Sequence, residues 1–184
     1  MKKILIIDNN DSFTANLEHL IAGFTGIKPD ILPYSRITNC DFNIYDLVVI
    51  SPGPGRPSDY PYYRILMQSG VPVLGICLGM QIMAEYFGGE VGRLAGCIHG
   101  RAEKIMFDSQ EFEVARYHSL YIKRLTKCFE VICENSNGVP LGIRHKDLPI
   151  IGYQFHPESF LTTNGVYFID YAFKFFNKHH TATV

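Results

Sequence analysis

The chain has 184 residues, of which 47% are hydrophobic and 19% charged, and its formal net charge is −1. This length and composition predict one well-packed domain over residues 1–184 and exclude a disordered chain. The near-neutral charge gives no electrostatic basis for binding nucleic acid or an anionic membrane surface.

Apolar runs and helical patterns alternate in the first half of the chain. Short apolar runs, typical of buried parallel strands, occupy residues 4–7, 31–32, 47–50 and 73–76. Apolar side chains recur at helical spacing over residues 17–24, with Asp11 or Ser12 as the expected N-cap. A second helix is expected over residues 62–68. Strands that alternate with helices predict a parallel sheet with helices on both faces.

The second half of the chain changes character. Short strand-like segments, linked by turns such as residues 135–138, occupy residues 103–107, 112–116, 129–133, 141–145 and 150–153. A last helix places Val166, Ile169, Phe173 and Phe176 on one face, which we expect to join the core. The whole pattern predicts an α/β fold: a three-layer sandwich with a mostly parallel central sheet, helices on both faces, and an antiparallel extension in the second half.

Cys77 stands at the most informative point of the sequence. The apolar run of residues 73–76 ends at this cysteine, Gly75 and Gly79 flank it at two residues' distance, and a helical pattern follows at once. This order is typical of a nucleophile elbow, with sulfur in place of a serine oxygen. Small flanking residues permit the strained turn, and a helix N-terminus favours a thiolate. The alternative is a buried core cysteine beside an unrelated turn.

A base for this nucleophile is available near the C-terminus, where His156, Pro157 and Glu158 follow the apolar residues 150–153. His156 can take the thiol proton and return it to a leaving group. Glu158 can orient the imidazole, because side chains two residues apart share one face of an extended segment. A histidine beside a glutamate is common on surfaces, so the hypothesis of a Cys77, His156 and Glu158 triad depends on the elbow.

The glycine-rich residues 51–55 follow the apolar run 47–50, so they lie at the carboxyl end of a predicted strand. Ligands bind at this edge of open α/β sheets. Backbone N–H groups of the loop can stabilise an oxyanion, and the N–H of Leu78 is the natural second donor. A plain Pro/Gly turn is the alternative. The spacing differs from that of phosphate-binding loops, so nothing favours a nucleotide site.

Four segments give the chain a resemblance to a known family. Residues 51–55, 75–81, 117–120 and 152–159 have the order and spacing found in class I glutamine amidotransferases. The opening residues 7–14 narrow the resemblance to the separate glutaminase subunits of anthranilate synthase and of aminodeoxychorismate (para-aminobenzoate) synthase. The resemblance covers essentially the whole chain.

The resemblance implies a mechanism and a set of site residues. Cys77 would attack the side-chain amide of glutamine to form a γ-glutamyl thioester, with His156 as acid and base and Glu158 orienting it. Contacts to glutamine and to the oxyanion are implied for Gly53, Pro54, Gly55, Leu78, Gln81, Ser119 and Leu120. His118 is expected to be structural rather than a base. No metal or cofactor is implied for this chain.

The resemblance also implies a partner. In this family the glutaminase subunit docks onto a larger synthase subunit, which binds chorismate with magnesium and uses the ammonia to form anthranilate or aminodeoxychorismate. These products lead to tryptophan and folate. Met80 and Asn10 depart from the family pattern, since this branch often has histidine at the first position and commonly an aromatic residue at the second. Neither has an implied catalytic role. We expect Met80 to alter the packing of the elbow helix or communication with the partner, and Asn10 to tune the interface with the partner.

The cysteines and the hydropathy pattern predict a cytoplasmic protein. The five cysteines form neither a C-x-x-C pair nor a disulfide framework, and they are Cys40, Cys77, Cys97, Cys128 and Cys133. Residues 4–7 are too short for a signal-peptide core, and no apolar run approaches membrane-spanning length.

Two other classes of function stay open. A stand-alone γ-glutamyl hydrolase or cysteine peptidase would need no partner, and residues 7–14 and 117–120 argue against it. A non-catalytic regulatory subunit would keep the fold without the chemistry, and the intact Cys77, His156 and Glu158 argue against that. The sequence does not separate the anthranilate pathway from the aminodeoxychorismate pathway, and one subunit can serve both.

Overall fold

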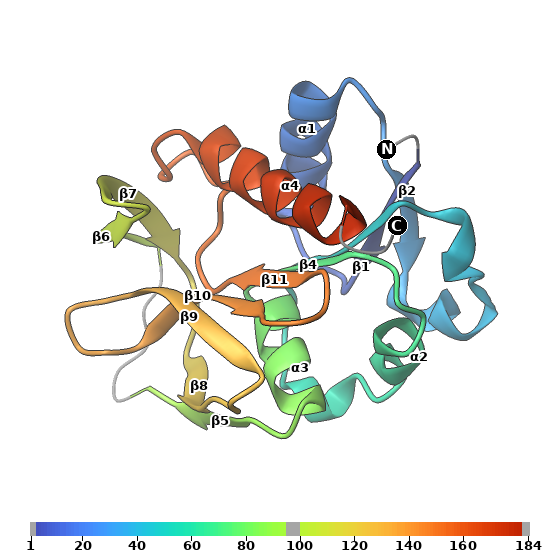
Figure 1. Cartoon of the computed structure of the whole chain (residues 1–184). Helices are drawn as coiled ribbons and strands as arrows, with labels where there is room; N and C mark the ends of the chain where they lie inside the picture. Colours follow the sequence, from blue (N-terminus) through green and yellow to red (C-terminus); the bar gives the residue numbers. More distant parts are fainter. Residues whose placement is uncertain (1–2, 95–99, 182–184) are drawn as a thin grey trace.

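The computed structural model describes residues 3–94 and 100–181, and a seven-stranded sheet forms its centre (Figure 1). The strand order is β2-β1-β3-β4-β11-β10-β9. In chain order the strands are β1 Ile4–Asp8, β2 Asp30–Pro33, β3 Leu47–Ile50, β4 Val73–Ile76, β9 Phe129–Glu134, β10 Pro140–His145 and β11 Ile150–Tyr153. The strands from β2 to β11 run parallel, whereas β10 and β9 are antiparallel at one edge.

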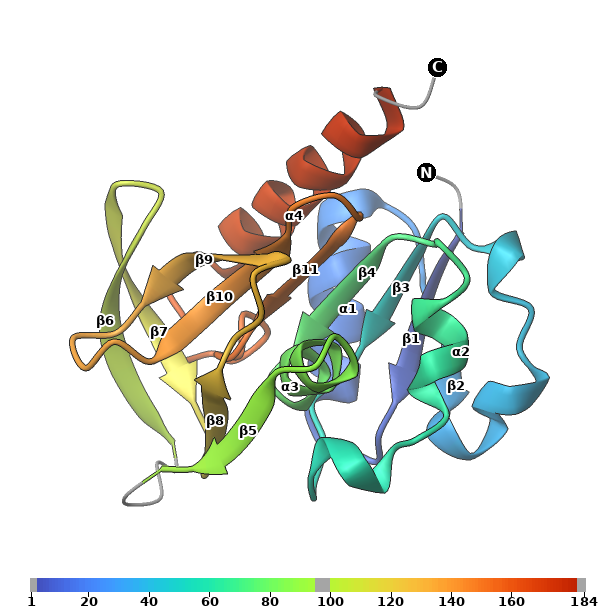
Figure 2. The same cartoon turned by 60° about the horizontal axis from the view of Figure 1, so that its bottom comes forward.

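Helices cover both faces of this sheet (Figures 1 and 2). On one face lie α1 Thr14–Thr25 and α4 Gly165–Thr181, which contact each other. On the other face lie α2 Tyr63–Met67 and α3 Leu78–Tyr86. Three short 3-10 helices complete the connections: η1 Tyr34–Asn39, η2 Phe42–Ile44 and η3 Pro57–Asp59.

The second half of the chain supplies the antiparallel extension. A hairpin joins β6 Arg101–Phe107 to β7 Gln110–Arg116, and β5 Glu90–Arg93 pairs with β8 Leu120–Arg124. The predicted fold class is therefore confirmed. The sequence pattern did not predict β5 or β8, because both mix charged and apolar residues and are only partly buried.

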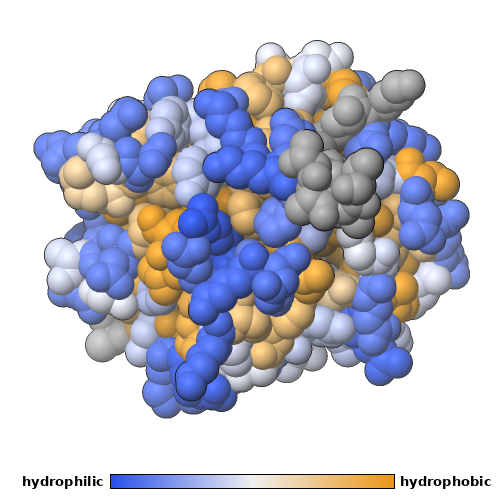
Figure 3. Space-filling model, in the orientation of Figure 1, coloured by the Kyte–Doolittle hydropathy of each residue, from blue (hydrophilic) through white to orange (hydrophobic). Residues whose placement is uncertain are grey.

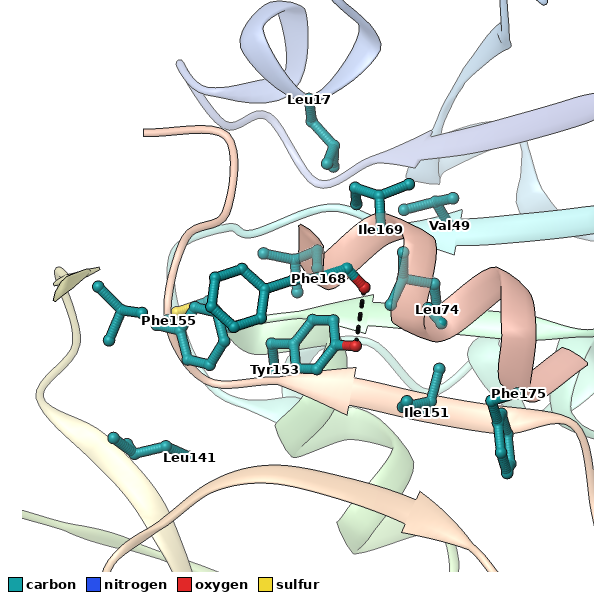
Figure 4. Close-up of a cluster of buried hydrophobic side chains, with 14 of the residues drawn as sticks. Leu17, Val49, Leu74, Leu141, Ile151, Tyr153, Phe155, Phe168, Ile169 and Phe175 are labelled. Carbon is teal, nitrogen blue, oxygen red and sulfur yellow. Dashed lines mark hydrogen bonds between the residues drawn. The ribbon is translucent and has the colours of Figure 1, made fainter. Parts of the chain in front are cut away.

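Alternation along the parallel strands produces two hydrophobic cores. Ile4 and Ile6 of β1 face one cluster, whereas Leu5 and Ile7 face the other. Figure 4 shows part of the first cluster, in which the aromatic rings of β11 and the segment after it stack on α4. The Tyr153 hydroxyl donates to the Phe168 carbonyl over 2.9 Å, so its polar end is satisfied inside the core.

Helix α4 shows a small error in the predicted core face. Phe168, Ile169 and Phe176 are fully buried, but Val166 is 43% exposed. The buried stripe consists of residues 168, 169, 172 and 176, and at about 100° per residue Val166 lies roughly 105° from the centre of that stripe, at its flank. The outer side of the helix is polar: Lys174 pairs with Asp170 over 2.6 Å. Hydrophilic residues accordingly cover much of the middle of the face that Figure 3 shows.

The expected N-cap of the first helix is also wrong. Phe13 occupies the N-cap of α1, and its side chain makes no capping hydrogen bond. Asp11 instead accepts from the Phe13 N–H over 2.8 Å, and Thr14 donates its hydroxyl to Asp8 over 2.7 Å. These side-chain hydrogen bonds fold the segment between β1 and α1 into a tight turn. As a result Phe13, and not Asp11 or Ser12, occupies the N-cap position of α1.

Two further observations concern the expectations for membranes and disulfides. Among the helices of residues 3–94 and 100–181, none combines the length and the apolar character that crossing a membrane requires. Four described cysteines are free, and they are Cys40, Cys77, Cys128 and Cys133. Cys97 lies outside the described residues.

The turn between β4 and α3 has the strained backbone of a nucleophile elbow. The backbone of Cys77 adopts φ 52° and ψ −101°, a conformation that residues other than glycine rarely take. Its neighbours must be small. A Cβ on Gly75 would lie 2.6 Å from the Gly79 carbonyl carbon, and a Cβ on Gly79 would lie 2.7 Å from the Ile50 carbonyl oxygen. β3, β4 and α3 therefore meet at backbone contact distance.

Substitution of Gly75 by alanine should destabilise the protein. The added methyl would collide with the backbone of Gly79, which cannot rotate away, so we expect Gly75→Ala to lower the free energy of unfolding by about 3 kcal/mol. Gly23→Ala is the matched control, because Gly23 lies on the exposed side of α1 and an added Cβ would meet no other atom there. It should raise stability by about 0.5–1 kcal/mol. Urea unfolding measures both, and equal effects would contradict the close contact.

Candidate active site

The sheet topology brings the predicted nucleophile and base together. β4 and β11 are parallel neighbours in the centre of the sheet, and the Cys77 N–H after β4 donates to the Tyr153 carbonyl at the end of β11 over 2.7 Å (Figure 2). The chain then continues from Tyr153 to His156. The His156 N–H donates to the Ala115 carbonyl of β7 over 3.0 Å, which holds this segment against the hairpin. Cys77 and His156 therefore reach the same sheet edge.

His156 and Glu158 form a buried pair. Nδ1 of His156 lies 2.7 Å from Oε1 of Glu158, and the two side chains are 3% and 0% exposed. Nε2 of His156 has no partner with hydrogen-bonding geometry among the described residues, although it interacts electrostatically with the sulfur of Cys77. The pair therefore presents one free ring nitrogen toward the nucleophile, with the carboxylate behind it.

The electrostatic environment holds His156 in its protonated form. Burial by itself would lower the pKa of His156, but the charge and contact of the Cys77 sulfur, together with Glu158, raise that pKa well above its ordinary value. The Cys77 sulfur and the Glu158 carboxyl group, which flank the imidazole, offset the cost of burying its protonated form. An imidazolium at this position can donate a proton to a leaving group.

Two aromatic rings enclose the imidazole. The Phe13 ring centroid lies 5.5 Å from that of His156, and the Tyr117 ring meets His156 edge-on at 5.0 Å. The two aromatic rings also contact each other at 5.1 Å, and the Tyr117 hydroxyl lies 3.1 Å from the Ser159 hydroxyl. These rings fix the imidazole plane and exclude water from one side of it. Neither was assigned a role from the sequence.

A pocket of about 210 Å³ opens beside Cys77. Every residue for which the sequence predicts a glutamine or oxyanion contact lines it, together with the nucleophile, and these residues are Gly53, Pro54, Gly55, Cys77, Leu78, Gln81, Ser119 and Leu120. Tyr117 and His118 complete the wall. A larger hollow of about 690 Å³ lies near the β6–β7 hairpin and the turn between β9 and β10, but Cys77 does not line it. The smaller pocket is therefore the candidate site.

Asn9 holds the glycine-rich loop in place. Its backbone N–H donates to the Ser51 hydroxyl and its side-chain amide to the Ser51 carbonyl, both over 2.9 Å. Tyr63 in turn donates its hydroxyl to the Asn9 side-chain oxygen over 2.6 Å. A Cβ on Gly53 would lie 2.5 Å from the Asn9 Cβ and 3.0 Å from the Leu78 side chain. The first βα turn thus fixes the loop after β3 against the helix that follows Cys77.

Gln81 and Gln154 form a buried amide pair at the back of the pocket. Nε2 of Gln81 donates to the Leu120 carbonyl over 3.1 Å and to Oε1 of Gln154 over 2.9 Å. Nε2 of Gln154 lies 3.4 Å from the Cys77 sulfur. The sequence motif pointed to Gln81, but Gln154 was not singled out, although it lies two residues before His156.

His118 has the structural role that the sequence predicts. Its Nδ1 donates to the Leu120 carbonyl over 2.6 Å, and its Nε2 accepts from Nε of Arg116 over 2.9 Å. Burial, followed by the charge of Arg116, lowers the pKa of His118 to about 4. Arg116 itself is buried and paired with Glu103. His118 is therefore neutral, with both ring nitrogens occupied, and has no free nitrogen to act as a base.

The comparisons with known proteins concern the family and the fold of the chain. A family model described as class I glutamine amidotransferase matches residues 5–176. Anthranilate synthase component 2 from Leptospira biflexa is 39% identical over 193 residues, covering 89% of this chain and 94% of the relative. The protein of the same description from Methanocaldococcus jannaschii is 39% identical, covering 88% and 87%. Aminodeoxychorismate synthase from Streptomyces griseus is 40% identical, but the match covers 24% of that longer protein and 89% of this chain.

Solved structures share the fold. A Thermoplasma acidophilum protein, described as one of the subunits of a GMP synthase, superimposes with a TM-score of 0.83 at 23% identity, covering 99% of this chain and 97% of that one. A glutamine amidotransferase from Thermotoga maritima gives a TM-score of 0.72 at 19% identity, covering 85% and 76%. At these identities the likeness concerns the fold alone.

Protonation of His118 should contribute to acid unfolding. Its pKa falls from 6.5 to about 4 on folding, so between these values the unfolded state binds a proton that the folded state does not. This term therefore lowers stability as the pH falls from 6.5 to 4, by about 3 kcal/mol in total. His118→Gln should be less stable at pH 7 and should lose this part of the acid dependence. Urea unfolding at several pH values measures it.

His19→Gln in α1 is the matched control for that experiment, because His19 is exposed and its replacement leaves the buried hydrogen bonds of His118 intact. It should keep the acid dependence of the unmodified protein. Parallel curves for the unmodified protein and His118→Gln from pH 7 to pH 4 would contradict a neutral, buried His118.

Proposed function

Because the chain belongs to the class I glutamine amidotransferases, we propose that it hydrolyses the side-chain amide of glutamine at Cys77 and delivers the ammonia to a chorismate-binding synthase subunit. One observation supports this proposal above the others. The strained elbow of Cys77, the buried His156–Glu158 pair and a pocket of about 210 Å³ meet at one edge of the sheet.

The first half of the reaction forms the thioester. The Cys77 sulfur attacks the side-chain amide carbon, and the electron pair of the C=O bond moves to the oxygen. Leu78 is the first residue of α3, so its N–H has no acceptor within the helix and can stabilise this oxyanion. A backbone N–H of residues 53–55 is the second donor. His156 gives its proton to the amide nitrogen, the C–N bond breaks, and ammonia leaves a γ-glutamyl thioester.

The second half of the reaction releases glutamate. Neutral His156 takes a proton from water, and the resulting hydroxide attacks the thioester carbon. The C–S bond then breaks, glutamate leaves, and the thiolate–imidazolium pair is restored. Glu158 stabilises the imidazolium in both halves through its 2.7 Å contact with Nδ1. The Phe13 and Tyr117 rings keep water from the His156 face that they cover.

The hydrogen bonds inside the pocket suggest how glutamine is held. The Leu120 carbonyl already accepts from His118 and Gln81, so its backbone oxygen is committed to protein donors. The Gln81 amide nitrogen is likewise occupied, which leaves its side-chain oxygen as an acceptor for an N–H group of the substrate. The exposed Ser119 can donate its hydroxyl to the substrate carboxylate.

We assign the synthase partner from the names of the relatives, which include component 2 of anthranilate synthase and aminodeoxychorismate synthase. The partner would bind chorismate and magnesium, and this chain would carry no cofactor of its own. Asn10 is exposed with φ 61°, in the turn that also supplies Phe13, so it is placed to contact a partner. Met80 is fully buried, so its effect on a partner is limited to the packing of α3. A reducing cytoplasm would keep the Cys77 thiol active.

The function is tested by following the amide nitrogen. The chain is recovered with its partner from source cells and given chorismate, magnesium and amide-labelled glutamine. Labelled anthranilate or labelled aminodeoxychorismate supports the proposal and identifies the pathway, and both products together mean a shared subunit. Label released only as ammonia, with no chorismate-using partner recovered, would contradict the proposed partner and leave the glutaminase.

Replacement of the nucleophile should abolish turnover without unfolding the protein. We expect Cys77→Ser to reduce glutamine hydrolysis at least about 10⁴-fold, because a serine hydroxyl is far less ionised than a thiol beside His156. Cys128→Ser is the matched control, since this half-buried cysteine lies outside the pocket and contacts Thr126. It should keep full activity. Glutamate release measures both, and substantial turnover by Cys77→Ser would rule out Cys77 as the nucleophile.

The partner should raise glutaminase activity. If docking shifts the oxyanion loop toward its active arrangement, the synthase partner stabilises that state, and we expect at least about a five-fold increase in glutamate release. The measurement adds increasing amounts of the synthase partner to a fixed concentration of this chain at saturating glutamine. Equal activity with and without the partner would contradict the coupling.

A further inference from the structure

Gln154 is fully buried beside the nucleophile, and the steps above do not use it. Its backbone N–H donates to the Leu141 carbonyl over 2.9 Å, which fixes the start of the segment that leads to His156. Its side chain reaches Cys77, which follows the neighbouring strand β4, with Nε2 3.4 Å from the sulfur. A buried amide next to a reacting sulfur affects the two ionisation states of that sulfur differently, depending on which end of the amide faces it.

The direction of the Gln154 amide is fixed by its neighbours. The Leu120 carbonyl can only accept, so Gln81 must present its NH₂ group to it, over 3.1 Å. The same NH₂ group donates to Oε1 of Gln154 over 2.9 Å. The Gln154 amide must therefore turn its own NH₂ group toward Cys77. The reverse orientation would bring the Gln154 NH₂ group against that of Gln81 and aim a carbonyl oxygen at the sulfur.

A second set of hydrogen bonds reaches the same Leu120 carbonyl from Arg116, through His118. Arg116 is always protonated and donates to Nε2 of His118 over 2.9 Å, so His118 carries its proton on Nδ1. That N–H donates to the Leu120 carbonyl over 2.6 Å. The Leu120 carbonyl accepts from both His118 and Gln81. This carbonyl therefore sets the direction of the Gln81 and Gln154 amides, whereas Arg116 sets only that of the His118 imidazole.

We propose that Gln154 is a positioning residue for Cys77: its side-chain N–H donates to the sulfur, favours the thiolate, and holds it pointing into the glutamine pocket. The inference rests on the proposed thioester chemistry for its purpose, but the hydrogen bond itself does not depend on glutamine. Gln81 then has two functions. It contacts the substrate through its oxygen, and it sets the direction of Gln154 through its nitrogen.

The decisive experiment measures the alkylation of Cys77 by iodoacetamide as a function of pH, resolved from other cysteines by peptide mass spectrometry. Gln154→Met keeps the length of the side chain but removes the donor. We expect the midpoint of its alkylation profile to move to higher pH by about one unit, because a hydrogen bond to the thiolate is lost. Glutamine turnover should fall about tenfold in kcat with little change in KM, since Gln154 does not line the pocket.

Other variants separate this role from a merely structural one. Gln81→Met should move the alkylation midpoint in the same direction and also raise KM, because Gln81 lines the pocket. Gln68→Met is the matched control on the exposed surface and should leave both unchanged. If Gln154→Met does not fold, the isosteric Gln154→Glu is measured instead, and its negative charge should move the midpoint further in the same direction.

The outcomes distinguish this inference from the proposed function. An unchanged alkylation midpoint in a folded Gln154 variant would overturn the inference, even if turnover fell. A shifted midpoint in a protein whose unmodified form does not hydrolyse glutamine would support the inference and refute the proposed function.

Discussion

The backbone of Cys77 is the constraint on which the rest of the structure depends. A residue other than glycine at positive φ costs of the order of 1–3 kcal/mol, and it persists only where the surroundings hold it. Here the hydrogen bond to the Tyr153 carbonyl and the contact of β3, β4 and α3 through Gly75 and Gly79 hold the turn. The same contacts fix where the loop after β3 and the segment after β11 meet. The strained turn and the shape of the site are therefore one feature.

The site depends on burial as much as on position. His156 is buried in its protonated form, and the Glu158 carboxyl group and the Cys77 sulfur beside it stabilise that form by raising the pKa of the imidazole. His118 lies 38 residues earlier in the chain and is also buried, and its burial and the charge of Arg116 keep it neutral by lowering its pKa. The two histidines thus have opposite protonation states in one region, and only His156 has a ring nitrogen free for proton transfer.

The sequence predicts the parts of the site that local chemistry defines. An elbow requires small residues around Cys77 and a strand before it, and a base requires a histidine with an oriented partner, so the sequence leads to the hypothesis of a Cys77, His156 and Glu158 triad. The sequence does not predict the role of Gln154, because that role consists of contacts to Gln81 and Cys77, which lie 73 and 77 positions earlier in the chain. Phe13 was missed for the same reason, since its contact with His156 arises only when the sheet is assembled.

The central claim is that Cys77 attacks the side-chain carbon of glutamine, and a glutamine-analogue electrophile tests it most directly. The chain, alone and in the complex recovered from source cells, is incubated with 6-diazo-5-oxo-L-norleucine and mapped by peptide mass spectrometry. The account predicts a single adduct on Cys77, formed more slowly when glutamine is present. No adduct in either preparation, or an adduct on another cysteine that glutamine does not suppress, would contradict it.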